Sequence, residues 1–132
     1  MNKGTSHAEE KKGWTGMKLY KIDGQVVISD KDLTLGTELI PNTTDAAGEK
    51  HVPVITTNGN EVKIEVGSVE HPSLPAHFIT FILLETSSGI HTKWLKAGDV
   101  PSATFILAEG ENVVSAYEYC NLHGLWKAEA WV

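Results

Sequence analysis

Four histidines and the only cysteine of the chain stand in settings where they could bind a metal. The cysteine and one histidine share the motif Cys120-Asn121-Leu122-His123-Gly124. His71 and His77 bracket a loop that holds two prolines, and His51 follows Glu49-Lys50 after a polar linker. Imidazole and thiolate are common ligands of transition metals, and loops on a rigid scaffold often carry such groups. The spacing therefore predicts a metal site.

Each of these residues also has an ordinary explanation. A histidine in a loop is most often solvated, and a lone cysteine most often packs as a small apolar side chain. We assign the solvated role to His7, near the N-terminus, and to His91, on a predicted strand. Cys-x-x-His-Gly together with His-x5-His is less easily explained by chance, so the pattern favours a metal.

The ligand set narrows the choice of metal. Structural zinc is almost always four-coordinate and often has several thiolates, whereas this chain offers five candidates and one sulfur. Imidazole suits iron, copper and nickel, and one thiolate adds electron-donating character. Four imidazoles in a plane with an axial thiolate would leave a sixth position open for a substrate. With iron(II), such a centre would carry a net charge of about +1 and attract an anion, to which Lys50 could contribute.

The elements that must position these residues are short β-strands. Glu61–Val66 alternates apolar and charged residues, and Phe78–Leu84 is a continuous apolar run typical of a central strand. Asp23-Gly24 and Asn58-Gly59 predict tight hairpin turns. The strands are predicted at 18–22, 25–29, 37–40, 51–56, 61–66, 78–84, 90–95, 102–109, 112–119 and 125–132, with one helical turn at 44–47. About seven strands after residue 48 predict an all-β, antiparallel sandwich.

Composition and charge set the remaining expectations. The 132 residues are 41% hydrophobic and 21% charged, as in globular proteins. We divide them into a flexible arm (1–16), a short cysteine-free N-terminal segment with a linker (17–48) and a metal-binding domain (49–132). The net charge of -6 argues against nucleic acid as a partner. A single cysteine excludes an intrachain disulfide, and the lack of an apolar span or signal pattern predicts a cytoplasmic protein and no membrane.

At the candidate metal-binding residues the chain resembles the superoxide reductase family, also known as desulfoferrodoxins and neelaredoxins. The matching segments are Glu49–Ile55, Val66–Pro72, His77 and Tyr117–Gly124. The resemblance implies an immunoglobulin-like antiparallel β-sandwich that holds one mononuclear iron per chain. It further implies that the iron is bound equatorially by four histidines and axially by the cysteine, namely by His51, His71, His77, His123 and Cys120.

The same resemblance implies the reaction, which is one-electron reduction of superoxide to hydrogen peroxide. Glu49 would ligate the ferric ion, and Lys50 would serve the anionic substrate. A small electron carrier such as rubredoxin would restore the iron, and the chain would form a homo-oligomer, either a dimer or a tetramer. Many relatives bind a second iron through four N-terminal cysteines, but residues 17–40 contain none, so that second site should be absent here.

Two other functions stay open from the sequence. A non-catalytic mononuclear iron electron carrier would use the same ligands, although an open coordination position would serve no purpose in it. A binding module with incidental histidines would hold no iron. Metal analysis separates the last possibility from the others, and oxidation of the reduced centre by superoxide separates the enzyme from the carrier.

Overall fold

A computed structural model describes residues 16–130 of the chain. Within that range the backbone forms ten strands and one turn of helix. The elements are β1 Lys18–Ile22, β2 Gln25–Ser29, β3 Thr37–Glu38, α2 Gly48–His51, β4 Pro53–Asn58, β5 Glu61–Val66, β6 Ile79–Thr86, β7 Gly89–Trp94, β8 Ser102–Ile106, β9 Val113–Cys120 and β10 Gly124–Glu129. The predicted strands are present, and the all-β class is confirmed.

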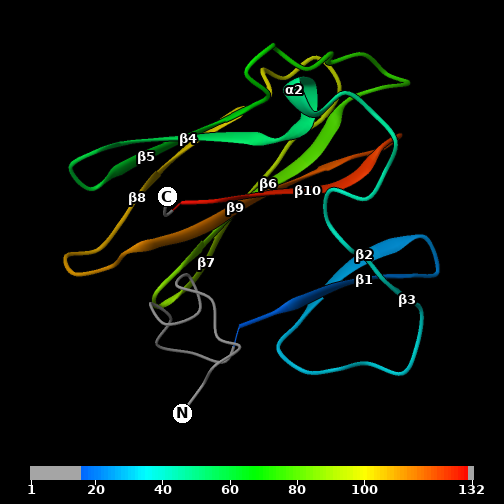
Figure 1. Cartoon of the computed structure of the whole chain (residues 1–132), viewed down its shortest axis with the longest axis horizontal. Helices are drawn as coiled ribbons and strands as arrows, with labels where there is room; N and C mark the ends of the chain where they lie inside the picture. The colour runs from blue at the N-terminus through cyan, green and yellow to red at the C-terminus, as the bar shows by residue number, and fades with distance from the viewer. Residues whose placement is uncertain (1–15, 131–132) are drawn as a thin grey trace.

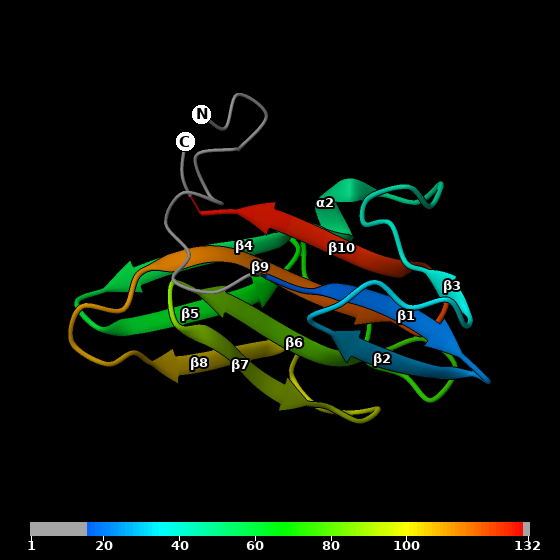
Figure 2. The same ribbon diagram turned by 90° about the horizontal axis from the view of Figure 1, so that it is seen from below.

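Two antiparallel sheets face each other in the larger part of the molecule. One has the strand order β10-β9-β6-β7 and the other the order β4-β5-β8 (Figures 1 and 2). Four strands packed on three, all paired antiparallel, make the immunoglobulin-like sandwich that was predicted.

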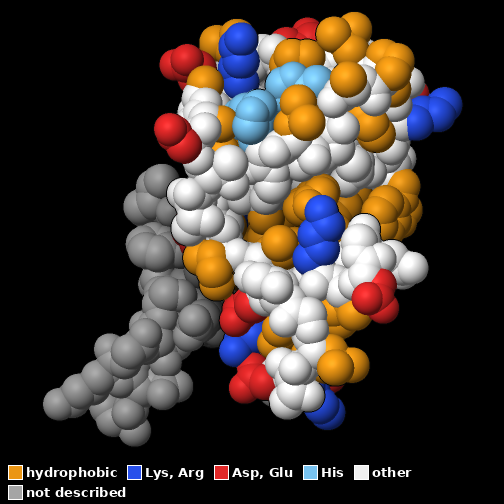
Figure 3. All heavy atoms as spheres, turned by 90° about the vertical axis from the view of Figure 1, so that its right-hand side faces the viewer, with side chains coloured by type: hydrophobic (Ala, Val, Ile, Leu, Met, Phe, Trp, Pro, Cys, Tyr) orange, Lys and Arg blue, Asp and Glu red, His pale blue; other side chains and the backbone are white. Residues whose placement is uncertain are grey.

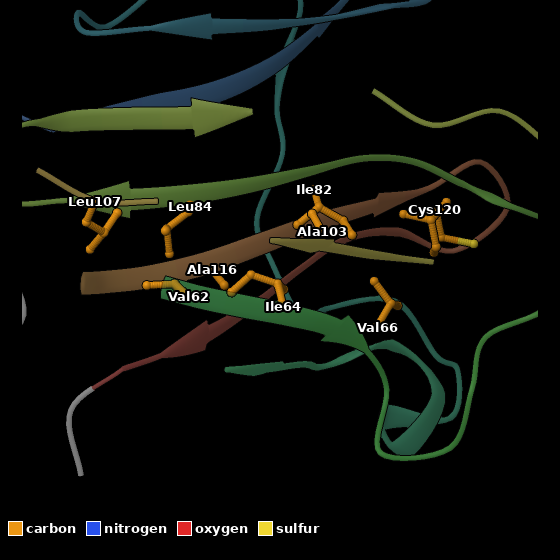
Figure 4. Close-up of a cluster of buried hydrophobic side chains, with 10 residues drawn as sticks. Val62, Ile64, Val66, Ile82, Leu84, Ala103, Leu107, Ala116 and Cys120 are labelled. Atoms are coloured by element: carbon orange, nitrogen blue, oxygen red, sulfur yellow. The ribbon is translucent and has the colours of Figure 1, made fainter. Parts of the chain in front are cut away.

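The main core lies between these two sheets. On β5 the side chains of Val62, Ile64 and Val66 alternate with exposed charged residues and point inward, as the period of two requires. Ile82 and Leu84 of β6 meet them from the opposite sheet. Figure 4 shows Cys120 at one end of this row, with its sulfur directed away from the other core side chains. The cysteine therefore belongs both to the core and to one end of the sandwich.

A third, smaller sheet with the order β2-β1-β3 covers the outer face of the four-stranded sheet. Leu19 of β1 packs there against Phe81, Leu83, Tyr117 and other side chains of a second core. β6 is buried on both faces for this reason, which explains its continuous apolar sequence. The predicted hairpin turn joins β1 to β2, with positive φ values of 49° at Asp23 and 78° at Gly24.

Some expectations differ from the structure or fall outside it. The helical turn is α2, at Gly48–His51, and no helix forms at 44–47. His51 consequently ends a helical turn, and the prediction that it opens a strand is wrong.

The predicted arm and His7 lie outside the described residues, apart from Gly16. Among residues 16–130, no helix is long and apolar enough to cross a membrane. The three-part division of the chain stays a prediction.

Candidate metal site

The five candidate ligands come from three segments that meet at one end of the sandwich. α2 supplies His51, the loop before β6 supplies His71 and His77, the end of β9 supplies Cys120, and the turn between β9 and β10 supplies His123. The start of β6 pairs with the end of β9, at Ile79 and Cys120, so the second and third segments are neighbours. Histidine side chains reach the surface at this end (Figure 3). β10 then runs from this end to the opposite one.

The four histidine rings are arranged as the corners of a square. Neighbouring ring centroids lie 4.8 Å apart for His51 and His71, 4.6 Å for His71 and His77, 5.0 Å for His77 and His123, and 4.9 Å for His123 and His51. The diagonal from His51 to His77 is longer, at 6.4 Å. Neighbouring rings are steeply inclined, whereas the rings on that diagonal are closer to parallel, at 30°. The four rings therefore lie around a common centre.

The cysteine sulfur and the inward nitrogens converge on that centre. Cys120 Sγ lies 3.4 Å from His71 Nε2 and 3.9 Å from His123 Nδ1. One potential ligand atom from each of His51, His77, Cys120 and His123 lies within 4.8 Å of the others. His77 Nε2 is buried and has no hydrogen-bond partner within the described chain. A buried nitrogen without a partner is costly, and a metal ion would satisfy it.

Backbone carbonyls orient two of the rings. His51 Nδ1 lies 2.7 Å from Ala47 O, and His71 Nδ1 lies 2.7 Å from Pro72 O. A carbonyl can only accept, so both Nδ1 atoms carry the proton and both Nε2 atoms present a lone pair. Metal-binding histidines usually have such an outer hydrogen bond, which fixes the tautomer and the ring orientation.

Burial sets the protonation of the same groups. It lowers the pKa values of His51 and His77, and it lowers the pKa of His71 to about 4. Burial also raises the pKa of the Cys120 thiol. These three rings are therefore neutral at neutral pH and ready to bind a metal, whereas the metal-free cysteine keeps its proton and must lose it when a metal binds.

A buried tryptophan supports two corners of the square. The Trp126 ring stacks on His51, with centroids 4.9 Å apart and an angle of 24°. Its indole N–H donates to His123 O at 3.1 Å. The sequence does not indicate this role, because a tryptophan on an alternating strand gives no sign that its indole N–H reaches the turn that carries a candidate ligand.

Glu49 and Lys50 lie on α2 directly before His51, and both side chains are exposed. The backbone there is held by the segment before His71, since Val69 N donates to Glu49 O at 3.0 Å. Burial is the main cause of the lowered pKa values of His51 and His77, and the positive charge of Lys50 is a smaller cause. Lys50 thus places positive potential at the site.

His91 does not join this group, as predicted, but the expectation of a solvated ring is wrong. Its Nε2 lies 2.9 Å from Glu111 Oε2 at the other end of the sandwich. Glu111 also accepts from Thr86 Oγ1 and from Ala108 N. These contacts hold the pKa of Glu111 at about 2 although partial burial would raise it. His91 therefore has a structural partner remote from the metal site.

The donor set fits iron better than structural zinc. A square of imidazoles with a sulfur beside it exceeds the four ligands of a tetrahedral structural zinc site and contains a single thiolate. Mixed imidazole and thiolate ligation suits a redox metal such as iron. His77 and His123 are only partly buried, so small molecules can approach the square.

Comparison with known proteins finds relatives that match most of the chain. The desulfoferrodoxin family model matches residues 43–129. A desulfoferrodoxin of Nitratidesulfovibrio vulgaris is 51% identical over 112 residues, which are 85% of each chain. The solved superoxide reductase of Treponema pallidum is 36% identical, with a TM-score of 0.79 over 86% of this chain and 99% of that one. A one-iron superoxide reductase of Giardia intestinalis is 33% identical, with a TM-score of 0.56 over 64% and 99%.

Proposed function

Because this chain belongs to the desulfoferrodoxin family, we propose that it is a superoxide reductase, which transfers one electron to superoxide and yields hydrogen peroxide. The observation that carries the proposal is the square of four imidazoles with a buried cysteine sulfur beside it. One iron per chain, in its ferrous form, would supply the electron. The proposed iron ligands are His51, His71, His77, His123 and Cys120.

The residues around the square have separate tasks in this proposal. Neutral, pre-oriented rings bind the metal without releasing protons, and His51 and His71 owe their orientation to backbone carbonyls. Lys50 attracts the anionic substrate to an acidic protein. Glu49, on the same helical turn, would offer its carboxylate as a further ligand to the iron. Because one electron passes in each turnover, an external reductant must restore the iron.

We place the docking of that reductant on the surface around the square. Val69, Leu74 and Leu122, from the loops that carry the candidate ligands, are exposed apolar side chains. They give a small electron carrier such as rubredoxin an apolar face close to the metal. Leu122→Ser should slow reduction by rubredoxin without changing the reaction with superoxide.

We also propose that the chain forms a homo-oligomer and that it lies in the cytoplasm, where a lone thiol stays reduced.

The function is tested by metal analysis followed by rapid mixing. The purified protein should contain about one iron per chain, and one equivalent of superoxide should oxidise the reduced protein and form peroxide without dioxygen. Iron that is not oxidised by superoxide would instead favour the non-catalytic electron carrier. Zinc, or no metal after expression in iron-rich medium, would contradict both functions.

A further inference from the structure

We propose that Asn121 is the positioning residue for His77. Asn121 holds the His77 ring in place by fixing the backbone on both sides of His77. The inference rests on the proposed function, because it takes His77 to be an iron ligand. Asn121 lies in the turn between Cys120 and His123, so the segment that carries two candidate ligands would also position a third.

Asn121 makes three hydrogen bonds to the two neighbours of His77. Its side-chain Oδ1 accepts from Phe78 N at 2.9 Å, and its Nδ2 donates to Ala76 O at 3.1 Å. Its backbone N donates to Phe78 O at 3.2 Å. One residue therefore fixes the peptide groups before and after His77, although it makes no hydrogen bond to the ring.

His77 needs such support more than the other candidate ligands. The rings of His51 and His71 are each held by a carbonyl, and the backbone of His123 is held by Trp126. No hydrogen bond to the His77 ring is found within the described residues. The loop has its own short bridge, between Leu74 and His77, but that bridge does not connect it to the rest of the site. The side chain of Asn121 adds two hydrogen bonds to the one that its backbone N makes with Phe78 O, and so ties the backbone on both sides of His77 to the segment of Cys120.

The test is the rate at which reduced, iron-loaded protein loses iron to a chromogenic iron(II) chelator. Loss of outer interactions of a metal ligand typically weakens metal binding about 10- to 100-fold, so Asn121→Ala should release iron faster by a factor in that range. The visible spectrum of the oxidised protein should change as well, because a displaced imidazole alters the ligand field. His77→Ala gives the reference for complete loss of the ring.

Asn42 offers a matched control. Its side chain makes the same pair of bonds to the backbone of one residue, accepting from Lys127 N at 2.9 Å and donating to Lys127 O at 3.1 Å, but it holds no candidate ligand. Asn42→Ala should lose at least as much stability, because Asn42 also has a positive φ of 63° that alanine tolerates poorly, and it should keep the wild-type spectrum and iron-release rate. If Asn121→Ala behaves like Asn42→Ala in both measurements, the inference is overturned and the proposed function stands.

Two further outcomes keep the test decisive. If His77→Ala holds iron as firmly as the wild type, the ligand assignment in the proposed function is itself wrong. If Asn121→Ala does not fold, Asn121→Asp decides, because it keeps the acceptor for Phe78 N and removes only the donor to Ala76 O. Faster release from Asn121→Asp would support the inference even though an added negative charge favours iron retention, and a wild-type rate would overturn it.

Discussion

Protonation of single residues controls how the metal-free site accepts a metal. Burial lowers the pKa values of His51, His71 and His77 but raises that of Cys120, so the sulfur carries the proton that must leave. Binding of iron(II) or zinc(II) at pH 7.5 should therefore release about one proton per chain. A pH indicator in weak buffer measures this release.

The cysteine can be isolated as the source of that proton. Cys120→Ser should bind metal more weakly and release almost no proton, because a serine hydroxyl keeps its proton at this pH. Release of two or more protons by the wild type would mean that histidines are charged in the metal-free protein, which contradicts the effect of burial on their pKa values.

The charge of Lys50 should act on the rate of encounter with superoxide. Lys50→Ala should slow the bimolecular reaction several-fold at low ionic strength, and the wild-type rate should fall more steeply with added salt than the mutant rate. Stopped-flow mixing of the reduced protein with superoxide measures both effects. Lys63→Ala is a suitable control, since it removes another exposed positive charge, on β5 of the sandwich.

Glu49→Ala separates the two roles proposed for α2. It should leave the encounter rate unchanged, or slightly increase it, while altering the spectrum of the resting oxidised protein. A Lys50→Ala variant with the wild-type rate and salt dependence would show that Lys50 does not steer the substrate.

At the scale of elements, the close packing of α2 on the loop before His71 depends on one glycine. Gly67 has a φ of 83°, and a Cβ there would overlap Val69 O and lie 2.7 Å from Glu49 O. Gly67→Ala should therefore displace α2, because the alanine would introduce both backbone strain and steric overlap. Strain of this kind costs about 1–3 kcal/mol, and the overlap adds to it.

Gly59→Ala provides the comparison for that variant. Gly59 also has a positive φ, of 64°, but no atom lies within 4 Å of a Cβ placed on it. Urea unfolding should show a larger loss of stability for Gly67→Ala than for Gly59→Ala, and only Gly67→Ala should weaken iron retention. Equal losses would show that the contact with Glu49 is unimportant.

The strands could be predicted from the sequence because their signals are local. Alternation marks β5, and glycine turns mark the ends of several strands. The helical turn was misplaced, because α2 owes its position to tertiary contacts such as Val69 N with Glu49 O, which no local pattern reports.

The candidate site was predictable to a similar degree. The identities of its five residues followed from residue type and motif, whereas the square depends on three segments meeting in space. The supporting contacts of Asn121 join residues 43 and 45 positions apart, and nothing in the motif indicates them.

For the whole molecule, a buried acid inside the sandwich affects stability. Glu118 is fully buried, neither carboxyl oxygen has a hydrogen-bond partner among the described residues, and burial raises its pKa to about 9. The folded metal-free protein thus keeps Glu118 protonated, while the unfolded chain ionises it above its ordinary pKa. The contribution of Glu118 to stability therefore falls as the pH rises from about 4.5 to about 9.

Glu118→Gln should remove that loss. The gain in unfolding free energy over the wild type should be small at pH 5 and larger by roughly 4 kcal/mol at pH 8, since each pH unit in this range contributes about 1.4 kcal/mol. Urea unfolding of both metal-free proteins at the two pH values measures the difference. A gain that does not change with pH would mean that the carboxyl group is ionised in the folded state.

The course of β10 has a practical consequence for the whole molecule. The strand leaves the metal-binding end at Gly124 and pairs Glu129 with Ser115, so Ala130 lies at the opposite end of the sandwich. A tether attached beyond Ala130 would fix the protein to an electrode with the square of histidines turned toward the solution. Immobilised in that orientation, the protein could serve as an amperometric sensor whose current reports superoxide reaching the exposed face.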